Sequence, residues 1–231
     1  MQTIDRRHIY GIMLDTETAN THATEDGKLD MTDVLPYDFG FAVIDSNGKI
    51  YEKFSYINTD IFLDEADLMQ SAYYADKIPQ YREDIRNGKR TLATTYTIQK
   101  KIHSLIKEYN CKFVVAHNMR FDLRACNNIV RWTTKSKYRY FFPRGIEIWD
   151  TLQMARDIMK HKPTFKDFCK KHGYMTKNNQ CRLTAEVLYR YITRNPDFEE
   201  AHTGLEDVEI EATILNYLKR QHKKMRKALF K

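Results

Sequence analysis

The sequence has few of the residues that interrupt regular structure, with 8 glycines and 5 prolines among 231 residues. No repeat or low-complexity linker divides it, so residues 1–231 are predicted to form one domain. The four cysteines include no C-x-x-C pair, which argues against a disulfide framework and favours reduced thiols. No apolar run approaches the roughly 18 residues of a membrane span. Residues 1–7 lack the apolar core of a signal peptide, so a cytoplasmic protein with no membrane partner is expected.

What the sequence does contain is typical of a globular protein, because 42% apolar residues can fill a core and 30% charged residues can cover a surface. The formal net charge is +7, and residues 219–231 contain seven Lys and Arg but no Asp or Glu. Residues 1–218 therefore carry equal numbers of positive and negative charges. We predict a basic C-terminal helical extension over residues 219–231. It either contacts phosphates or an acidic partner, or is a solvated helix end whose cations complement the helix dipole.

Short runs rich in β-branched and aromatic residues predict strands at residues 9–16, 37–45, 50–57, 113–116 and 146–149. Helical patterns occur at residues 64–75, 80–87 and 95–109 and again after residues 118, 151, 165, 184 and 204. This order predicts an α/β fold with a mixed β-sheet, formed by a three-strand antiparallel meander plus two parallel strands and flanked by α-helices. That arrangement is typical of the ribonuclease H-like folds. Residues 58–93 are predicted to be a helical insertion.

The first candidate site motif is an apolar strand that runs directly into two carboxylates, Asp15 and Glu17. Side chains repeat every second residue along a strand, so both acids emerge on the same face. Two desolvated acids side by side repel one another unless a cation neutralises them, and hard oxygen ligands suit Mg²⁺ or Mn²⁺. The alternative is a solvated strand end with incidental acids.

The second motif follows the strand at residues 113–116, where Asn118 is an expected N-cap and Asp122 lies in the opening helical turn. Ligand sites of α/β sheets gather at this end of a strand, so Asp122 is a candidate ligand. Its alternative role is a favourable charge at a helix N-terminus.

In the third motif, Thr203 and Glu206 fit a capping box with Thr203 as the N-cap. His202 then precedes the cap and Asp207 is the fourth helical residue. These two positions touch in a hydrophobic staple, which predicts an imidazole beside a carboxylate. The alternative is that His202 merely caps and Asp207 merely favours the helix dipole.

Taken in this order, Asp15-x-Glu17, Asn118-x-x-Phe121-Asp122 and His202-x4-Asp207 resemble the motifs of the DEDDh 3'-5' exonucleases, in particular the type of the proofreading ε subunit of bacterial DNA polymerase III. A sister branch carries a tyrosine three residues closer in than the histidine, and this sequence has no tyrosine there. The resemblance extends over residues 9–218.

The resemblance implies a hydrolase that removes nucleoside 5'-monophosphates from the 3' end of single-stranded DNA with two divalent metal ions, Mg²⁺ or Mn²⁺. By similarity, Asp15 bridges both ions, Glu17 and Asp207 complete the site of the attacking water, and Asp122 supports the leaving-group ion. His202 takes the proton from the water. Residues that match neighbours of the 3' nucleotide are Thr16, Asn118 and Phe121. Implied partners are a nucleic acid with a free 3' end and a DNA polymerase or another replication protein.

The sequence is also compatible with several alternative functions and site residues. An RNA-trimming exoribonuclease would need the same acids, and a catalytically silent module for binding nucleic acid or a polymerase would share the fold. His117 is a rival base. A zinc site is conceivable because four candidate ligands lie close in sequence: His161, Cys169, His172 and Cys181. Tyrosines and Arg82 in the insertion, and the basic and aromatic residues 124–144, either bind a nucleic-acid strand or, for the aromatics, belong to the core.

Overall fold

The computed structural model describes residues 4–20, 22–23, 29–30 and 32–230. Its strands are β1 (Tyr10–Ala19), β2 (His22–Ala23), β3 (Leu29–Asp30), β4 (Leu35–Asp45), β5 (Ile50–Asn58), β6 (Thr91–Ala93), β7 (Phe113–Ala116) and β8 (Glu147–Asp150). Its α-helices are α1 (Thr59–Phe62), α2 (Ile78–Arg86), α3 (Thr95–Glu108), α4 (Met119–Thr134), α5 (Thr151–Met159), α6 (Pro163–Lys171), α7 (Ala185–Thr193) and α8 (Gly204–Lys219). Two 3₁₀ helices are η1 (Leu68–Ser71) and η2 (Ala75–Lys77).

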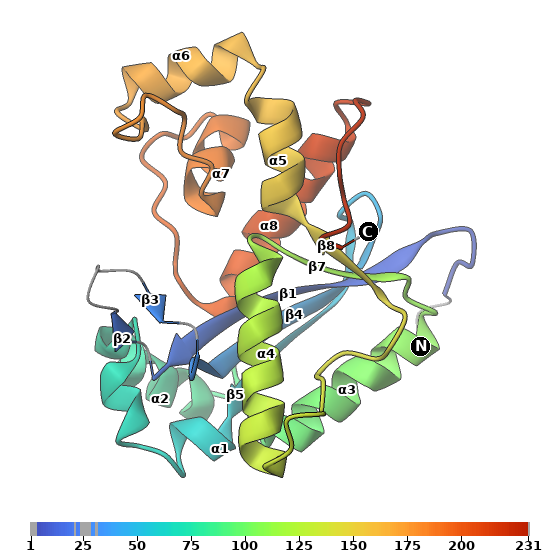
Figure 1. The fold of residues 1–231 in the computed structure, drawn as a ribbon, viewed down its shortest axis with the longest axis vertical. Helices are drawn as coiled ribbons and strands as arrows, with labels where there is room; N and C mark the ends of the chain where they lie inside the picture. Colours follow the sequence, from blue (N-terminus) through green and yellow to red (C-terminus); the bar gives the residue numbers. More distant parts are fainter. Residues whose placement is uncertain (1–3, 21, 24–28, 31, 231) are drawn as a thin grey trace.

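The main sheet has the order β6-β5-β4-β1-β7-β8. β1, β4 and β5 form the antiparallel meander, and β7 and β8 continue it in parallel beside β1. The predicted ribonuclease H-like α/β fold is therefore confirmed (Figure 1). β6 was not predicted because it is only three residues long and two of them are exposed; it pairs in parallel with β5 at the edge.

Helices cover both faces of the sheet, and alternate side chains of β1 supply both cores. Ile12 and Leu14 pack in the core beneath α3 and α4, whereas Met13 packs in the core beneath α5 and α8. Figure 1 shows α4 crossing one side of the sheet, α5, α6 and α7 in the upper part of the view, and α8 nearer its centre. None of the described helices is long and apolar enough to cross a bilayer. The same alternation continues to the end of β1, so that Asp15 and Glu17 point to one face of the sheet and Thr16 points to the other.

The first turn of α8 approaches the sheet so closely that only glycine fits on both sides of the contact. A Cβ added to Gly40 on β4 would lie 1.9 Å from the carbonyl carbon of Gly204. A Cβ added to Gly204 would lie 2.5 Å from the backbone nitrogen of Gly40. Gly40 is also the register partner of Asp15 on β1. The pair of glycines therefore brings the N-terminus of α8 directly over the strand that carries the acids.

A buried polar network fixes the same turn. Asp38 on β4 is fully buried, and its Oδ2 accepts hydrogen bonds from the backbone nitrogen of Gly204 (3.0 Å), the hydroxyl of Tyr81 (2.8 Å) and the guanidinium of Arg90 (3.2 Å). Arg90, 4% exposed, also donates to Glu206 at 3.2 Å. Because Tyr81 and Arg90 belong to residues 58–93, this segment is tied to α8 rather than appended to the fold.

The predicted helical insertion over residues 58–93 is only partly helical. The helix predicted at residues 64–75 is wrong, since turns and the 3₁₀ helix η1 occupy most of it. Only Met69 and Ala72 of this stretch are buried, and so few buried side chains do not hold a continuous α-helix. Tyr81 was expected to be available to a nucleic acid, but it is 1% exposed and belongs to the core.

The predicted helical extension over residues 219–231 is also wrong for the part that the structure describes, because α8 ends at Lys219. The chain then turns back along β8: the nitrogen of Asp150 donates to the carbonyl of Lys227 (3.0 Å), and the nitrogen of Leu229 donates to the carbonyl of Ile148 (2.7 Å). These bonds cover an open sheet edge, and Leu229 is buried. A local helical pattern does not reveal such a distant edge.

We expect Gly204→Ala to destabilise the protein by about 1–3 kcal/mol, because the new Cβ would collide with β4. Helix propensity alone predicts the opposite sign, a gain of up to about 1 kcal/mol for alanine. Thermal unfolding distinguishes the two, with a fall in Tm of about 2–4 °C per kcal/mol. Glu209→Ala, at an exposed position of the same helix, is the control and should change stability little. An unchanged or raised Tm in Gly204→Ala would contradict the close approach.

Candidate active site

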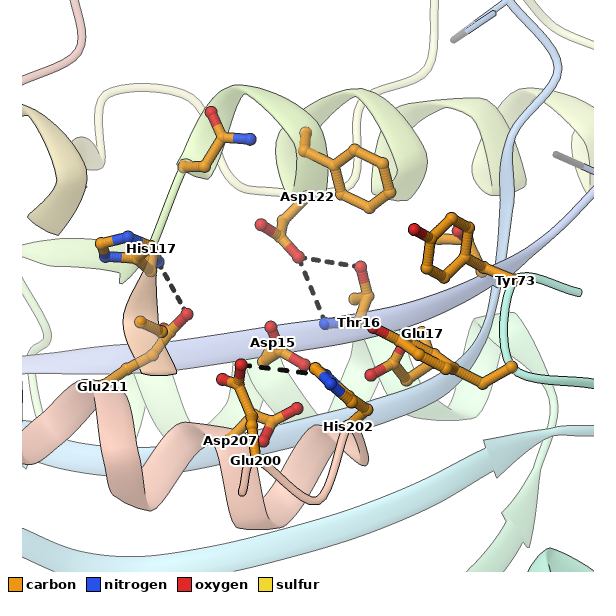
Figure 2. Close-up of a pocket in the computed structure, with 15 residues that line it drawn as sticks. Asp15, Thr16, Glu17, Tyr73, His117, Asp122, Glu200, His202, Asp207 and Glu211 are labelled. Atoms are coloured by element: carbon orange, nitrogen blue, oxygen red, sulfur yellow. Dashed lines mark hydrogen bonds and ion pairs between the residues drawn. The ribbon is translucent and has the colours of Figure 1, made fainter. Parts of the chain in front are cut away.

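A pocket of about 470 Å³ opens at the C-terminal part of β1, between the first turns of α4 and α8 (Figure 2). All eight residues that the sequence predicted for the site line it: Asp15, Thr16, Glu17, Asn118, Phe121, Asp122, His202 and Asp207. The other lining residues are Thr18, Tyr73, Tyr74, His117, Ala185, Glu200 and Glu211. Segments far apart in the sequence therefore converge on one cavity.

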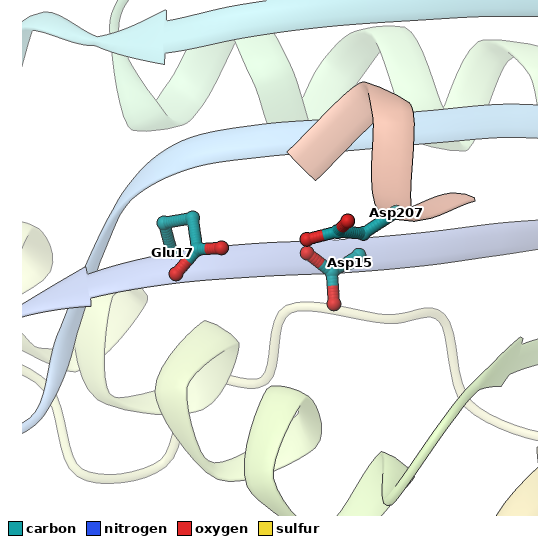
Figure 3. Close-up of side chains that lie close together, drawn as sticks. All are labelled: Asp15, Glu17 and Asp207. Carbon is teal, nitrogen blue, oxygen red and sulfur yellow. The ribbon is translucent and has the colours of Figure 1, made fainter. Parts of the chain in front are cut away.

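Three of the acids lie close together. Asp15 and Glu17 project from the same face of β1, as period-two spacing predicts, and α8 brings Asp207 beside them (Figure 3). One carboxylate oxygen from each lies within 4.8 Å of the others. Glu17 and Asp207 are buried, whereas Asp15 is partly exposed to the pocket. The spacing is short enough for one ion to contact all three side chains.

The fourth predicted acid, Asp122, lines the pocket from the first turn of α4 but is not part of that three-residue cluster. Its Oδ1 accepts hydrogen bonds from the backbone nitrogen of Thr16 (3.2 Å) and from the hydroxyl of Thr16 (2.8 Å). Thr16 points to the α4 side of β1 because it alternates with Asp15 and Glu17. The predicted substrate contact Thr16 thus anchors an acid of the site.

Like charge and burial make the anionic form of these acids unfavourable. Burial, followed by repulsion from neighbouring carboxylates, holds the pKa of Asp15 and of Glu17 well above the usual range. Burial likewise raises the pKa of Asp122 to about 7 and that of Asp207 to about 8. The Oδ1 atom of Asp207 is buried without a hydrogen-bond partner among the described residues. Orphaned carboxylate oxygens in an acidic cluster fit a hard divalent cation such as Mg²⁺ or Mn²⁺.

Two further acids line the pocket and were not predicted. Glu211 lies one helical turn beyond Asp207, is 2% exposed, and accepts a hydrogen bond at Oε1 from the backbone nitrogen of His117 (2.9 Å). Its Oε2 atom has no hydrogen-bond partner in the described part of the chain, and burial holds the pKa of Glu211 well above the usual range. The four-residue spacing from Asp207 was the available signal. Glu200 lies beside His202, and burial raises its pKa to about 7.

His202 reaches the pocket in a way that the capping pattern did not predict. Its backbone is left-handed, with φ of 50°. Its ring stacks on Tyr74, with centroids 4.6 Å apart and planes 13° from parallel, and its Nδ1 lies 3.8 Å from Oε2 of Glu200. Burial, and next the charge of Lys77, lower the pKa of His202. The imidazole is therefore neutral at pH 7 and accessible from the pocket.

The expected capping box at the start of α8 is wrong. Thr203 is the N-cap, but its side chain caps no backbone nitrogen. Its hydroxyl donates instead to Oε2 of Glu206 at 2.5 Å, while the nitrogen of Gly204 bonds to Asp38. Asp38 and Arg90 of the buried network bind the nitrogen of Gly204 and the carboxylate of Glu206, so these groups do not form the bonds of a capping box. Asn118 likewise occupies the N-cap of α4 in a left-handed conformation without a side-chain bond.

His117 has little freedom to act as a base. Its Nδ1 lies 3.0 Å from the hydroxyl of Thr151, and its Nε2 lies 2.7 Å from the carbonyl oxygen of Leu183. Both ring nitrogens are thus used to connect structural elements, and burial lowers the pKa of the ring. In the part of the chain that the structure describes, Nε2 of His202 has no such partner.

The zinc alternative finds no support among the described residues. There, Asp15, Glu17 and Asp207 form the only group of three or more His, Cys, Asp or Glu residues with ligand atoms close together. All four cysteines are free thiols. Cys169 is fully buried in the core beneath α5 and α8, as expected for an apolar side of a short helix.

No family model matches the chain, and no curated protein is significantly similar to it in sequence. Solved structures of Exonuclease I share its fold. The Escherichia coli enzyme in complex with a dA16 oligonucleotide matches with a TM-score of 0.55 and 18% identity, over 92% of this chain and 41% of that one. The Methylocaldum szegediense enzyme matches with a TM-score of 0.55 and 19% identity, over 93% and 41%. The chain therefore spans about two fifths of the length of these enzymes.

We expect a divalent cation to stabilise the protein more at about pH 8 than at about pH 6. Acids whose pKa is raised on folding contribute stability at low pH that is lost as the pH rises through the folded-state values, here about 7 for Asp122 and about 8 for Asp207. The chelated protein should therefore lose stability over this window. A bound cation offsets the repulsion only where the acids are ionised. Thermal unfolding with Mg²⁺, Mn²⁺ or chelator measures both effects.

Asp207→Asn should raise the Tm of the chelated protein at about pH 8 and reduce the shift caused by the cation. Asp197→Asn, at an exposed position outside the pocket, is the control and should keep the full shift. A shift that is independent of pH, or equally large in Asp207→Asn, would contradict a metal site at these acids.

Proposed function

We propose that this protein is a 3'-5' exonuclease that hydrolyses single-stranded DNA to nucleoside 5'-monophosphates with two divalent ions, Mg²⁺ or Mn²⁺. The observation that carries this proposal is the convergence of Asp15, Glu17, Asp122 and Asp207 with His202 on one pocket. The fold shared with Exonuclease I, whose structures include complexes with oligonucleotides, supports the substrate class. A DNA polymerase or another replication protein is proposed as a further partner from the sequence motifs alone.

The ions would be held by Asp15, Glu17, Asp122 and Asp207. Bound there, they would supply Lewis-acid polarisation of the scissile phosphate and lower the pKa of the attacking water. The surrounding protein fixes the acids before substrate arrives: β1 orients Asp15 and Glu17, and Thr16 holds Asp122 by two hydrogen bonds. Ligands that are already ordered lose less conformational entropy on binding.

His202 is proposed to accept the proton of the attacking water. It is suited to this role because its lowered pKa keeps the ring neutral at pH 7 and because its Nε2 is not used by the described structure. Tyr74 stacks on one face of the ring and so limits its rotation. Lys77 donates to the carbonyl oxygens of Ala201 and His202 and thereby fixes the backbone that carries the ring.

The rest of the pocket is proposed to receive the 3' nucleotide. Phe121 and Tyr73 offer aromatic faces for a base or sugar, and Tyr73 is 69% exposed. Asn118 offers an exposed amide beside them. A pocket flanked by the first turns of α4 and α8 surrounds a chain terminus more readily than a phosphate in the middle of a strand, which favours attack from an end.

The direct test uses single-stranded DNA, duplex DNA and RNA, each labelled at the 5' end, with Mg²⁺, Mn²⁺ or chelator. A ladder that shortens from the 3' end of single-stranded DNA, and only with metal, is expected. Faster shortening of RNA would identify an exoribonuclease instead, and binding without shortening would identify a silent binding module.

Asp15→Asn should lower hydrolysis by at least about a thousandfold, because it removes the acid expected to contact both ions. The variant should fold normally, and without metal it should be at least as stable as the wild type, since one repulsive charge is lost. Asp64→Asn, at an exposed acid of the insertion, is the matched control and should keep full activity. Hydrolysis at the wild-type rate in Asp15→Asn would contradict the assignment.

The rate should rise with pH through the lowered pKa of His202 and then level off, since only the neutral ring accepts a proton. In Lys77→Gln the rise should move to higher pH, because the positive charge that lowers this pKa is removed. In His202→Ala the residual rate of hydrolysis should no longer rise with pH in this range. If the rise persists unchanged in His202→Ala, it arises from other groups and the assigned base is wrong.

A further inference from the structure

A second groove, of about 550 Å³, begins where the candidate active site ends. It shares Asn118 and Phe121 with that pocket and continues along the outer face of α4. Its other lining residues are Arg120, Leu123, Arg124, Asn127, Asn128, Arg131 and Phe230. The groove and the pocket therefore adjoin at the first turn of α4.

The groove is basic throughout. Arg120, Arg124 and Arg131 fall on one stripe of α4, because spacings of four and seven residues return to the same helical face. Among the residues that the structure describes, no acidic side chain lines the groove. Over the length of the helix, the stripe covers about 16 Å, enough for more than one phosphate of a bound strand.

The charge of this stripe is not neutralised within the described structure. Arg120 and Arg124 are exposed and form no ion pair with a described residue. Arg124 makes only a minor contribution to the lowered pKa of Asp30, which arises mainly from hydrogen bonds to Thr32. Arg131 donates to the carbonyl of Arg139 (3.4 Å) and its guanidinium lies 5.5 Å from the centroid of the Tyr140 ring, and it forms no ion pair with a described residue.

An aromatic side chain completes the groove. Phe230 is 57% exposed and lines the same surface, although it follows the segment that is hydrogen-bonded to β8. The buried neighbour Leu229 anchors it there. Exposed aromatic rings beside a row of cations are the two elements that bind single strands, through base stacking and phosphate attraction.

We infer that this groove binds the stretch of single-stranded nucleic acid that lies 5' of the terminal nucleotide, an inference that rests on the proposed function. Without metal the acids of the pocket offer no positive charge to a polyanion, so affinity for the strand has to come from outside it. The arginine stripe of α4 supplies that attraction directly beside the pocket. Duplex DNA fits less well, because its bases are stacked on one another and do not offer free faces to Phe230 and Phe121.

The first experiment measures binding without hydrolysis. A fluorescein-labelled dT12 oligonucleotide is titrated with the protein in chelator at several salt concentrations, and anisotropy gives the dissociation constant. The slope of log affinity against log salt is negative, and each lost phosphate contact reduces its magnitude by about 0.7. Arg120→Gln, Arg124→Gln and Arg131→Gln together should therefore reduce the magnitude by about 2. An unchanged slope would overturn the inference, whether or not the protein is a nuclease.

The matched control removes the same number of charges from α6, at the exposed residues Lys166, Lys170 and Lys171. Lys166→Gln, Lys170→Gln and Lys171→Gln together should leave the slope close to that of the wild type. An equal loss in both triple variants would mean that overall net charge, rather than the groove, attracts the strand. Phe230→Ala should raise the dissociation constant at least about fivefold with little change in its salt dependence. An unchanged dissociation constant would show that Phe230 does not contact the strand.

The second experiment measures hydrolysis as a function of length. The triple arginine variant should lose at least about tenfold in kcat/KM on a 12-nucleotide strand, and the loss should become smaller as the substrate is shortened towards a dinucleotide. A loss of equal size at every length would place the arginines in the chemistry and overturn the groove. If the wild type hydrolyses no substrate, the proposed function fails, while the binding experiment still decides about the groove.

Discussion

The mutual repulsion of buried carboxylates at the end of β1 is the constraint on which the rest of the site depends. Asp15 and Glu17 share a strand face, and the close contact between Gly40 and Gly204 forces Asp207 against them. Without a cation, burial and the neighbouring carboxylates disfavour the ionised form of each of these groups and raise its pKa. The fold therefore uses part of its stability to keep together side chains that would separate in water, which is the arrangement expected of a metal site.

Interactions outside the acidic cluster stabilise the fold enough to keep its carboxylates together. Asp38 and Arg90 form a buried ion pair that is completed by Tyr81 and by the first backbone nitrogen of α8. Lys77 adds bonds to the loop before α8. Residues 58–93 thus act mainly as a brace for the site, with Tyr73 and Tyr74 as their contribution to the pocket surface. A brace of buried, mutually bonded groups keeps a strained site rigid.

Charge is distributed over the surface in a way that the net value of +7 does not reveal. The pocket is acidic, whereas the groove on α4 beside it is basic. Part of the basic C-terminal segment is used internally, since Arg226 pairs with Asp157 and Lys227 lies over the ring of Trp149. The pocket accordingly suits cations, and the groove suits a polyanion. Because the two adjoin, a nucleic-acid strand bound in the groove would place its terminal phosphodiester beside the cations of the pocket.

The sequence by itself determined the order of β1, β4, β5, β7 and β8 and the common face of Asp15 and Glu17, because both follow from local periodicity. Its resemblance to the DEDDh exonucleases indicated eight of the residues that line the pocket. Only the tertiary structure decided how close Asp207 comes to Asp15, that Tyr74 stacks on His202, that Glu211 joins the pocket, and that residues 227–229 follow β8 instead of a helix. Those features depend on contacts between segments far apart in the chain. Local patterns carry no information about which distant edge, ring or glycine a segment will meet.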